Sequence, residues 1–133
     1  MQSSEAIFYP GQQVILRSGS PIMTVNAFYD NDSYVDCFWF DTVIGIERYE
    51  ARLPSRVLTL YVESEIASNT LQLPAPQVGD VVQLRSGGPS MTVEFVRLSD
   101  FDNNVSCIWF DEQCRTMTPC SGGFHPNALV LES

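Results

Sequence analysis

Apolar residues recur at every second position in several short stretches of the chain, and this period-two pattern predicts β-strands. In residues 13–16 and 81–84 the alternate positions are Val and Leu, whereas the position between them changes from Ile to Gln. Residues 35–39 and 105–109 alternate in the same way, with Val, Cys and Trp on one face. Since no stretch keeps an apolar stripe with helical spacing, we predict an all-β protein.

This pattern occurs twice along the chain. Residues 11–25 (GQQVILRSGSPIMTV) and 79–93 (GDVVQLRSGGPSMTV) are identical at ten of their fifteen positions. Later segments match in the same order, which indicates that a whole structural unit is repeated. The further matching pairs are VDCFWFD at 35–41 with VSCIWFD at 105–111, and LPSRVLTL at 53–60 with FHPNALVL at 124–131.

We expect three parts: a first β-barrel repeat at residues 7–60, a linker at 61–76 and a second β-barrel repeat at 77–133. Glycine and proline in the RSGSP and RSGGP turns permit a tight connection between the first two strands of each repeat. Small SH3-like barrels of the KOW and Tudor kind have such short strands. A unit of this size buries only about 60% of its unfolded surface. We therefore predict two tandem SH3-like barrels that pack together or form a homo-oligomer.

The second repeat resembles a known family. GDVVQLRSGGPSMTVEFV, followed by CIWFD and the terminal FHPNALVLE, is similar to the YodC-like family of uncharacterised small bacterial proteins. The resemblance covers nearly all of the second repeat and most of the first. It implies a tandem duplication of the family's unit and a bacterial or phage origin, and it assigns no activity and no catalytic residue.

Charge and hydropathy argue against two classes of partner. The net charge is -9 and all seven basic residues are arginines, so the surface repels a phosphate backbone. No apolar stretch reaches the roughly 20 residues that cross a bilayer, and the first residues lack the pattern of a secretory signal. We therefore expect a cytoplasmic protein that binds neither duplex nucleic acid nor a membrane.

The repeated Arg-Ser-Gly turn is the first candidate for a ligand site. A guanidinium beside backbone amides can hold an anion such as a phosphate or a carboxylate. Two turns would give two equivalent sites, or one composite site between the repeats. The alternative is that each arginine pairs with Asp41 or Asp111 while the glycines shape a hairpin. The candidate ligand-binding residues are Arg17, Ser18, Gly19, Arg85, Ser86, Gly87 and Gly88.

Large apolar side chains beside the two tryptophans give a second candidate, a surface for a protein partner. Small barrels bind peptides in grooves lined by aromatic residues. The alternative is that these side chains bury the contact between the repeats, and either interpretation shields Phe40 and Phe110 from water. We also expect Trp39 and Trp109 to have like surroundings. The candidate partner-binding residues are Phe38, Phe40, Ile108, Phe110, Tyr29 and Tyr34.

Cys107, Cys114, Cys120 and His125 form a Cys3His set of the kind that zinc accepts, although the spacing C-x6-C-x5-C-x4-H matches no standard finger. The first repeat has only the equivalent of Cys107, which is Cys37, so we expect both of these thiols to be core residues and no metal to be bound. A disulfide between the cysteines at 114 and 120 would be unusual in a reducing cytoplasm.

Catalytic groups are sparse. The single histidine stands between Phe124 and Pro126, and no serine or cysteine forms a triad-like pattern with it. Asp41 and Asp111 follow a Trp-Phe pair in both repeats, where an aspartate typically ends a strand. We expect no enzyme and no cofactor. The leading hypothesis is a non-catalytic interaction module, of the adaptor or inhibitor type, that binds a protein partner; the alternative is a binder of a small anionic ligand or nucleotide.

Overall fold

The computed structural model describes residues 8–29, 33–41, 47–62, 71, 74–99, 103–110 and 119–132. Within these residues the regular structure consists of ten β-strands and two single-turn 3-10 helices. The prediction of an all-β protein is therefore confirmed. No helix in this part of the chain has the length and apolar character that crossing a membrane requires.

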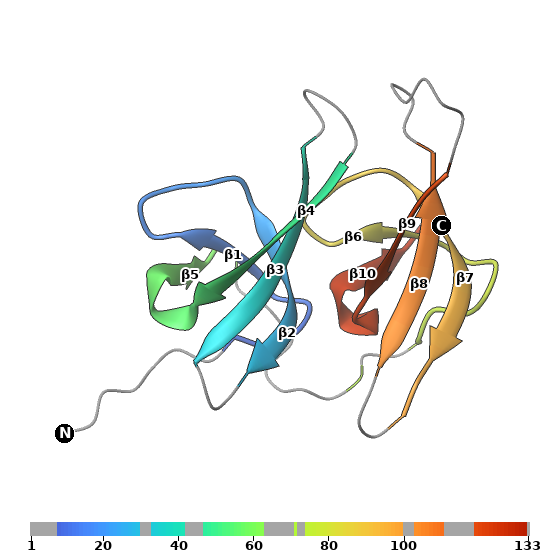
Figure 1. Ribbon diagram of the computed structural model, residues 1–133, viewed down its shortest axis with the longest axis horizontal. Coiled ribbons are helices and arrows are strands. Elements are labelled where there is room, and N and C mark those ends of the chain that lie inside the picture. Colours follow the sequence, from blue (N-terminus) through green and yellow to red (C-terminus); the bar gives the residue numbers. More distant parts are fainter. Residues whose placement is uncertain are drawn as a thin grey trace.

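The strands form two separate antiparallel sheets of five (Figure 1). Read along the hydrogen-bonded neighbours, the first sheet has the order β4-β3-β2-β1-β5 and the second has the order β9-β8-β7-β6-β10. Each strand of the first sheet thus has a counterpart in the second. The first sheet comprises β1 (Gln13–Leu16), β2 (Met23–Tyr29), β3 (Tyr34–Asp41), β4 (Glu47–Pro54), the turn η1 (Ser55–Val57) and β5 (Leu58–Leu60).

The second sheet repeats the first in detail. Val25 pairs with Cys37 and Val93 pairs with Cys107, and in both sheets the register shifts immediately afterwards, at Asn26 or at Glu94. This correspondence gives every residue discussed below a counterpart in the other sheet. The second sheet comprises β6 (Val81–Leu84), β7 (Met91–Arg97), β8 (Asn104–Trp109), β9 (Cys120–Phe124), η2 (Pro126–Ala128) and β10 (Leu129–Leu131).

Both sheets are open. Among the described residues, strand pairing ends at β4 and β5 in the first sheet and at β9 and β10 in the second, so neither sheet closes on itself through hydrogen bonds. The structure therefore shows two open five-stranded sheets whose alternate residues face inward. The 3-10 turns η1 and η2 connect the last two strands of each sheet.

Each sheet has its own core, but the two cores differ in where their residues come from. The core of the first sheet is built from its own side chains, including Phe8, Val14, Val25 and Leu58. The core of the second sheet contains its own residues and also Phe38, which belongs to β3 of the first. The second core is therefore completed by the first sheet.

The two sheets lie side by side in like orientation (Figure 1). β5 and η1 lie at one end of the first sheet, and β10 and η2 take the corresponding place in the second. β2 and β3 of the first sheet face the second sheet, while their counterparts β7 and β8 lie at the far end of the molecule. A shift rather than a twofold rotation relates the sheets.

Candidate functional site

The contact between the sheets uses two of the aromatic residues that the sequence indicates as a partner surface. The Phe38 ring is only 5% exposed and meets Phe124 edge-on, with 5.7 Å between the ring centroids. The half-buried Phe40 meets Trp109 in the same manner at 5.5 Å. Both rings therefore bury the contact between the repeats, as the alternative interpretation predicts, and neither ring is available to an outside partner.

Polar contacts fix the position of these rings. The Thr24 hydroxyl donates to Ser86 Oγ at 2.7 Å and accepts from the Ser86 backbone N–H at 2.9 Å. Asn26 Oδ1 accepts a hydrogen bond of 2.6 Å from the backbone N–H of His125. These bonds run from β2 to the β6–β7 turn and to the start of η2. They position the first sheet against the second at two separated points.

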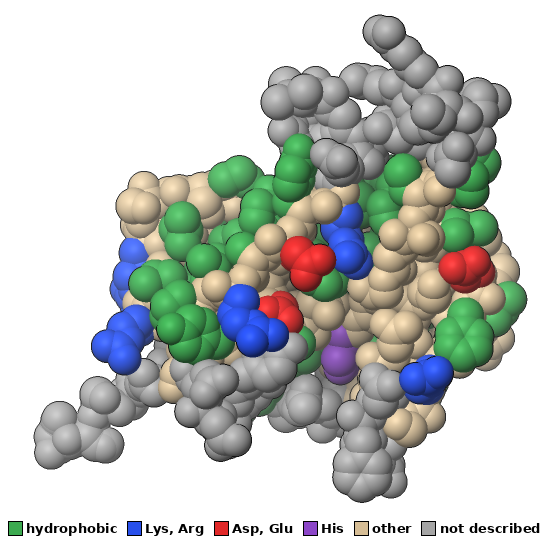
Figure 2. Space-filling model, viewed as in Figure 1, with side chains coloured by type: hydrophobic (Ala, Val, Ile, Leu, Met, Phe, Trp, Pro, Cys, Tyr) green, Lys and Arg blue, Asp and Glu red, His purple; other side chains and the backbone are tan. Residues whose placement is uncertain are grey.

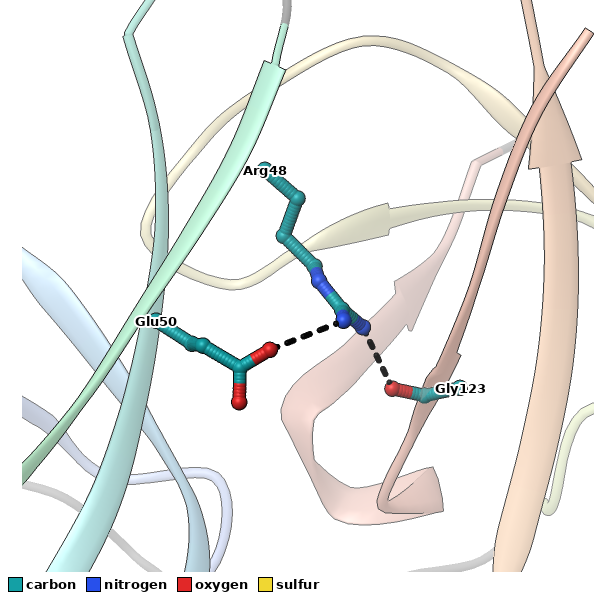
Figure 3. A network of polar contacts seen from close by, with 3 residues as sticks. All are labelled: Arg48, Glu50 and Gly123. Carbon is teal, nitrogen blue, oxygen red and sulfur yellow. Dashed lines mark hydrogen bonds and ion pairs between the residues drawn. The ribbon is translucent and has the colours of Figure 1, made fainter.

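Arg48 of β4 adds a charged contact at the same place (Figure 3). Its Nη1 donates to the carbonyl oxygen of Gly123 at 2.9 Å, and its Nη2 pairs with Glu50 at 3.2 Å. The guanidinium lies 4.4 Å from the Phe38 ring centroid, a distance typical of a cation–π contact. A Cβ atom at Gly122 would come within 2.7 Å of Nη1, so β9 needs a glycine there. Arg48 is not among the site residues predicted from the sequence; the adjacent glycines at 122 and 123, unusual inside a strand, are the signal that would have indicated a close approach.

Two surfaces therefore meet between the sheets. We call the one on the first sheet the inserting surface and the one on the second sheet the receiving surface. The inserting surface comprises Thr24, Asn26, Phe38, Phe40 and Arg48. The receiving surface comprises Ser86, Gly88, Trp109, Gly122, Gly123, Phe124 and His125.

The second sheet carries a counterpart of the inserting surface that faces solvent. Ile108, at the position of Phe38, is half-buried, and Phe110, at the position of Phe40, is 59% exposed. The expectation that Phe110 is shielded from water is therefore wrong. The physical reason is that no described residue packs over this side of the second sheet in the way that the second sheet packs over the first.

The first sheet carries a counterpart of the receiving surface that is only partly covered. Trp109 is buried at 5% exposure beneath Phe40, whereas Trp39 is half-buried and stacks on Tyr49 with ring centroids 5.9 Å apart. Leu53, the counterpart of the fully buried Phe124, is half-buried as well. The expectation of like surroundings for the two tryptophans is therefore wrong, because only Trp109 receives rings from the neighbouring sheet.

The Arg-Ser-Gly turns have structural partners inside the protein. Arg17 Nε donates to the carbonyl of Arg56 in η1 at 3.0 Å, and Arg85 Nε donates to the carbonyl of Asn127 in η2 at 2.6 Å. The backbone N–H groups of Gly19 and Gly87 each donate to the leucine three residues earlier. Both turns thus use these donors to fold the hairpin and hold the 3-10 turn.

Other members of the predicted ligand set differ between the turns. Ser18 is exposed, whereas the hydroxyl and the N–H of Ser86 are bonded to Thr24. Gly88 adopts φ 148°, and a Cβ there would collide with the Phe40 ring. Its carbonyl accepts a bond from Gln83 at 2.7 Å. The second turn is therefore engaged in the contact between the sheets.

A cavity of about 230 Å³ lies beside the second turn. Arg85 contributes the charged part of its lining, and the rest comes from prolines and from apolar side chains of β10. The lining residues are Pro74, Pro76, Arg85, Pro126, Leu129, Val130 and Leu131.

The remaining predicted residues lie apart from both surfaces or outside the described part. Tyr34 is exposed at the start of β3, and the side chain of Tyr29 lies outside the described residues. Cys114, Asp111 and the side chain of Asp41 lie outside them too.

The cysteines and His125 have individual roles in the fold. Burial raises the pKa of Cys37 and of Cys107 to about 12, with a smaller contribution from Asp36 or Glu94. The Nδ1 atom of His125 accepts a bond of 3.0 Å from the Asn127 N–H, and burial lowers the histidine pKa to about 4. Among the described residues, no three metal-ligating side chains come together.

Comparison with known proteins gives a match to a family model. Searches of curated proteins and of solved structures find no match. Residues 77–120, which run from the turn before β6 to the first residue of β9, match the family model described as an uncharacterised small protein family, DUF2158.

Proposed function

We propose that the protein is a non-catalytic interaction module in which the first sheet binds an extended segment of a protein partner. In this proposal the chain is a tandem duplication of a YodC-like, SH3-like unit of bacterial or phage origin, and it acts as an adaptor or inhibitor. The single observation that supports it most is the pair Trp39 and Trp109. The second tryptophan is covered by Phe40, and the first, in the equivalent place, is partly exposed.

The ligand's chemistry follows from what the receiving surface of the second sheet already holds. It takes two phenylalanines two residues apart on one strand, because alternate residues of a strand project on the same side. It also takes the hydroxyl of Thr24 beside the Arg-Ser-Gly turn. We therefore expect the first sheet to bind a strand with large apolar residues at alternate positions, a recognition mode in which pockets read every second side chain.

The test is direct binding of a peptide with the sequence of residues 34–41 in which the cysteine is replaced by serine. Fluorescence anisotropy of a dye-labelled peptide should show saturable binding. A matched peptide with serine at both phenylalanine positions should not bind. In the protein, Trp39→Ala should weaken binding at least tenfold, whereas Phe95→Ala, which removes an exposed aromatic side chain elsewhere, should not.

Ser18→Glu gives a second variant that leaves the core untouched, because Ser18 is an exposed turn residue. Ser18 is the counterpart of Ser86, whose hydroxyl contacts Thr24 of the first sheet. The variant therefore places a charge at the equivalent position of the first sheet. Equal binding of the two peptides, or binding unaffected by both protein variants, would contradict the proposed function.

A binder of a small anionic ligand or nucleotide is the second candidate, and the position of Arg85 in the wall of the cavity favours it. Thermal unfolding with inorganic phosphate and with ATP tests this candidate. A rise in Tm that is absent from an Arg17→Ala, Arg85→Ala double variant would support it. An unchanged Tm in the wild-type protein would reject it.

A further inference from the structure

The contact between the sheets is directional, and each sheet carries the counterpart of the surface that the other one uses. In the chain, the inserting surface of the first sheet meets the receiving surface of the second. The second sheet still presents its own inserting positions at one end of the molecule, and the first sheet presents its own receiving positions at the other (Figure 1). A contact of this head-to-tail kind joins unlike surfaces, so it can repeat from one molecule to the next.

The side chains at these two remaining surfaces match in size. Phe38 meets Phe124 within the chain, and the counterparts are Ile108 and Leu53, which are both aliphatic. Phe40 meets Trp109, and the counterparts are Phe110 and Trp39, which preserve the pair of ring types.

The hydroxyl contact is preserved as well. Thr24 meets Ser86 within the chain, and its counterpart Thr92 would meet Ser18. Thr92 and Ser18 are both exposed in the structure. Two apolar pairs and one hydroxyl pair can therefore form again between molecules.

The positions that differ change together on the two surfaces. Within the chain, Arg48 of the inserting surface requires a glycine at 122 of the receiving surface. The counterpart of Arg48 is Pro119, and the counterpart of Gly122 is Ala51. Since no guanidinium would arrive at Ala51, the extra methyl group is accommodated.

The second coupled change replaces a hydrogen bond with charges. Within the chain, Asn26 accepts a bond from the His125 N–H. The counterpart of Asn26 is Glu94, and the counterpart of His125 is Pro54, which has no N–H to donate. Exposed arginines stand two residues before and two residues after Pro54, at 52 and 56. Arg52 pairs with Asp36 at 3.1 Å and Glu94 accepts a bond from Ser106 at 2.9 Å, so an incoming Glu94 carboxylate would join an existing ion pair. Figure 2 shows basic side chains at the β5 end of the molecule, and both an acidic and a basic side chain at the opposite end, where β7 and β8 lie.

One position alters the fit. Gly88 lies against the Phe40 ring, and its counterpart is Ser20, whose hydroxyl accepts from the Leu16 N–H and donates to the Pro21 carbonyl. The Ser20 side chain is thus turned toward its own loop. Phe110 must therefore settle closer to Trp39 and further from the turn than Phe40 does in the chain.

We propose that the protein self-associates head to tail, with the outer side of β7 and β8 in one copy docking on the Trp39 side of the first sheet in the next. This inference rests on the proposed function, because the second copy supplies the extended apolar segment that the first sheet binds. The like orientation of the two sheets means that the contact does not close after two molecules (Figure 1). We expect linear chains that lengthen with protein concentration.

Sedimentation velocity over a concentration series tests the proposal with the full chain. The wild-type protein should show a mass that rises continuously past the dimer. Phe110→Glu removes the inserting surface and Ser18→Glu blocks the receiving surface, and each variant alone should remain monomeric. Both positions are exposed, so neither variant disturbs a core. Val78→Glu, with the same charge change at a site that belongs to neither surface, should behave as the wild type does.

Mixing the two variants that do not self-associate, Phe110→Glu and Ser18→Glu, is the decisive step. Each still carries one intact surface, so a mixture should form a one-to-one dimer that grows no further. A symmetric dimer through the second sheet alone would be lost in Phe110→Glu and would not return on mixing, which would overturn the head-to-tail arrangement. A wild-type monomer at every concentration would overturn self-association. In that case, binding of the phenylalanine-bearing peptide would still support the proposed function, so the two can fail separately.

Discussion

The side-chain oxygen of Asn26 accepts a hydrogen bond of 2.6 Å from the backbone N–H of His125, ninety-nine residues later in the chain. This bond joins β2 of the first sheet to the start of η2 in the second. Together with the ring contacts of Phe38 and Phe40, it makes the contact between the sheets a specific interface rather than an accidental proximity. The stability of the second sheet should therefore respond to substitutions in the first.

Phe38 and Ile108 occupy equivalent positions on the two sheets and provide a matched pair. Phe38→Ala removes a ring that belongs to the core of the second sheet and should lower the free energy of unfolding by about 3–5 kcal/mol. Ile108→Ala, at the half-buried position, should cost roughly 1 kcal/mol, since little packing is lost at a partly exposed position. Urea denaturation of both variants at low concentration measures the difference. Equal losses of unfolding free energy in the two variants would show that Phe38 does not stabilise the core of the second sheet.

Gly88 and Gly87 provide a second matched pair. Both have positive φ, so alanine at either position costs roughly 1–3 kcal/mol in backbone strain. Only Gly88→Ala also forces the Phe40 ring to move. We expect Phe40→Ala to cost less in the Gly88→Ala background than in the wild type, because the ring has already been displaced. A double-mutant cycle by denaturant unfolding measures this coupling. Additive losses of stability would show that the Phe40 ring does not lie against residue 88.

His125 should make stability fall as the pH decreases from about 6.5 to about 4. Burial lowers its pKa in the folded state to about 4 from 6.5, so the unfolded chain binds the proton first and gains from acidification. Because the ring is partly exposed, we expect a loss of about 1–2 kcal/mol. His125→Asn keeps a side-chain acceptor for the Asn127 N–H and should remove this part of the pH dependence. Urea unfolding of both proteins at pH 7 and pH 4.5 gives the comparison. If the free energy of unfolding falls by the same amount in both proteins between these pH values, the assignment to His125 is contradicted.

Cys37 and Cys107 should resist alkylation in the folded protein. Both side chains are fully buried, and their raised pKa of about 12 keeps them as thiols at pH 8, where the thiolate is the reactive form. Iodoacetamide at pH 8 followed by peptide mass spectrometry should find both unmodified in the native protein and modified after denaturation. Modification of either in the native state at the rate of the unfolded chain would contradict the buried positions.

The sequence predicts the strands best where polar and apolar residues alternate and the two copies agree. Val35, Cys37 and Val105 face inward as the period of two indicates. The alternation also places Phe38 and Ile108 on one side of their strands, but it cannot say which of them is covered. That depends on the packing of one sheet against the other, which local pattern does not encode.

The predicted anion site shows a different limit. Arg17 and Arg85 stand beside glycines, as an anion site requires, but their Nε atoms bond to carbonyls of η1 and η2 about 40 residues away in the chain. The side chains of Asp41 and Asp111, the alternative partners, lie outside the described residues. A guanidinium donor can bond equally well to a bound anion or to an exposed carbonyl at the end of a short helix, and only the tertiary arrangement decides between them.

The one-way dependence of the two cores fits the order in which a ribosome makes the chain. Domains generally fold as units during synthesis, with the N-terminal part first. The first sheet carries a core of its own side chains and can form while the rest is still being made. When residues 77–133 emerge, Phe38 and Phe40 are already in position on the folded first sheet. Trp109 and Phe124 can then pack against these rings before they contact other chains.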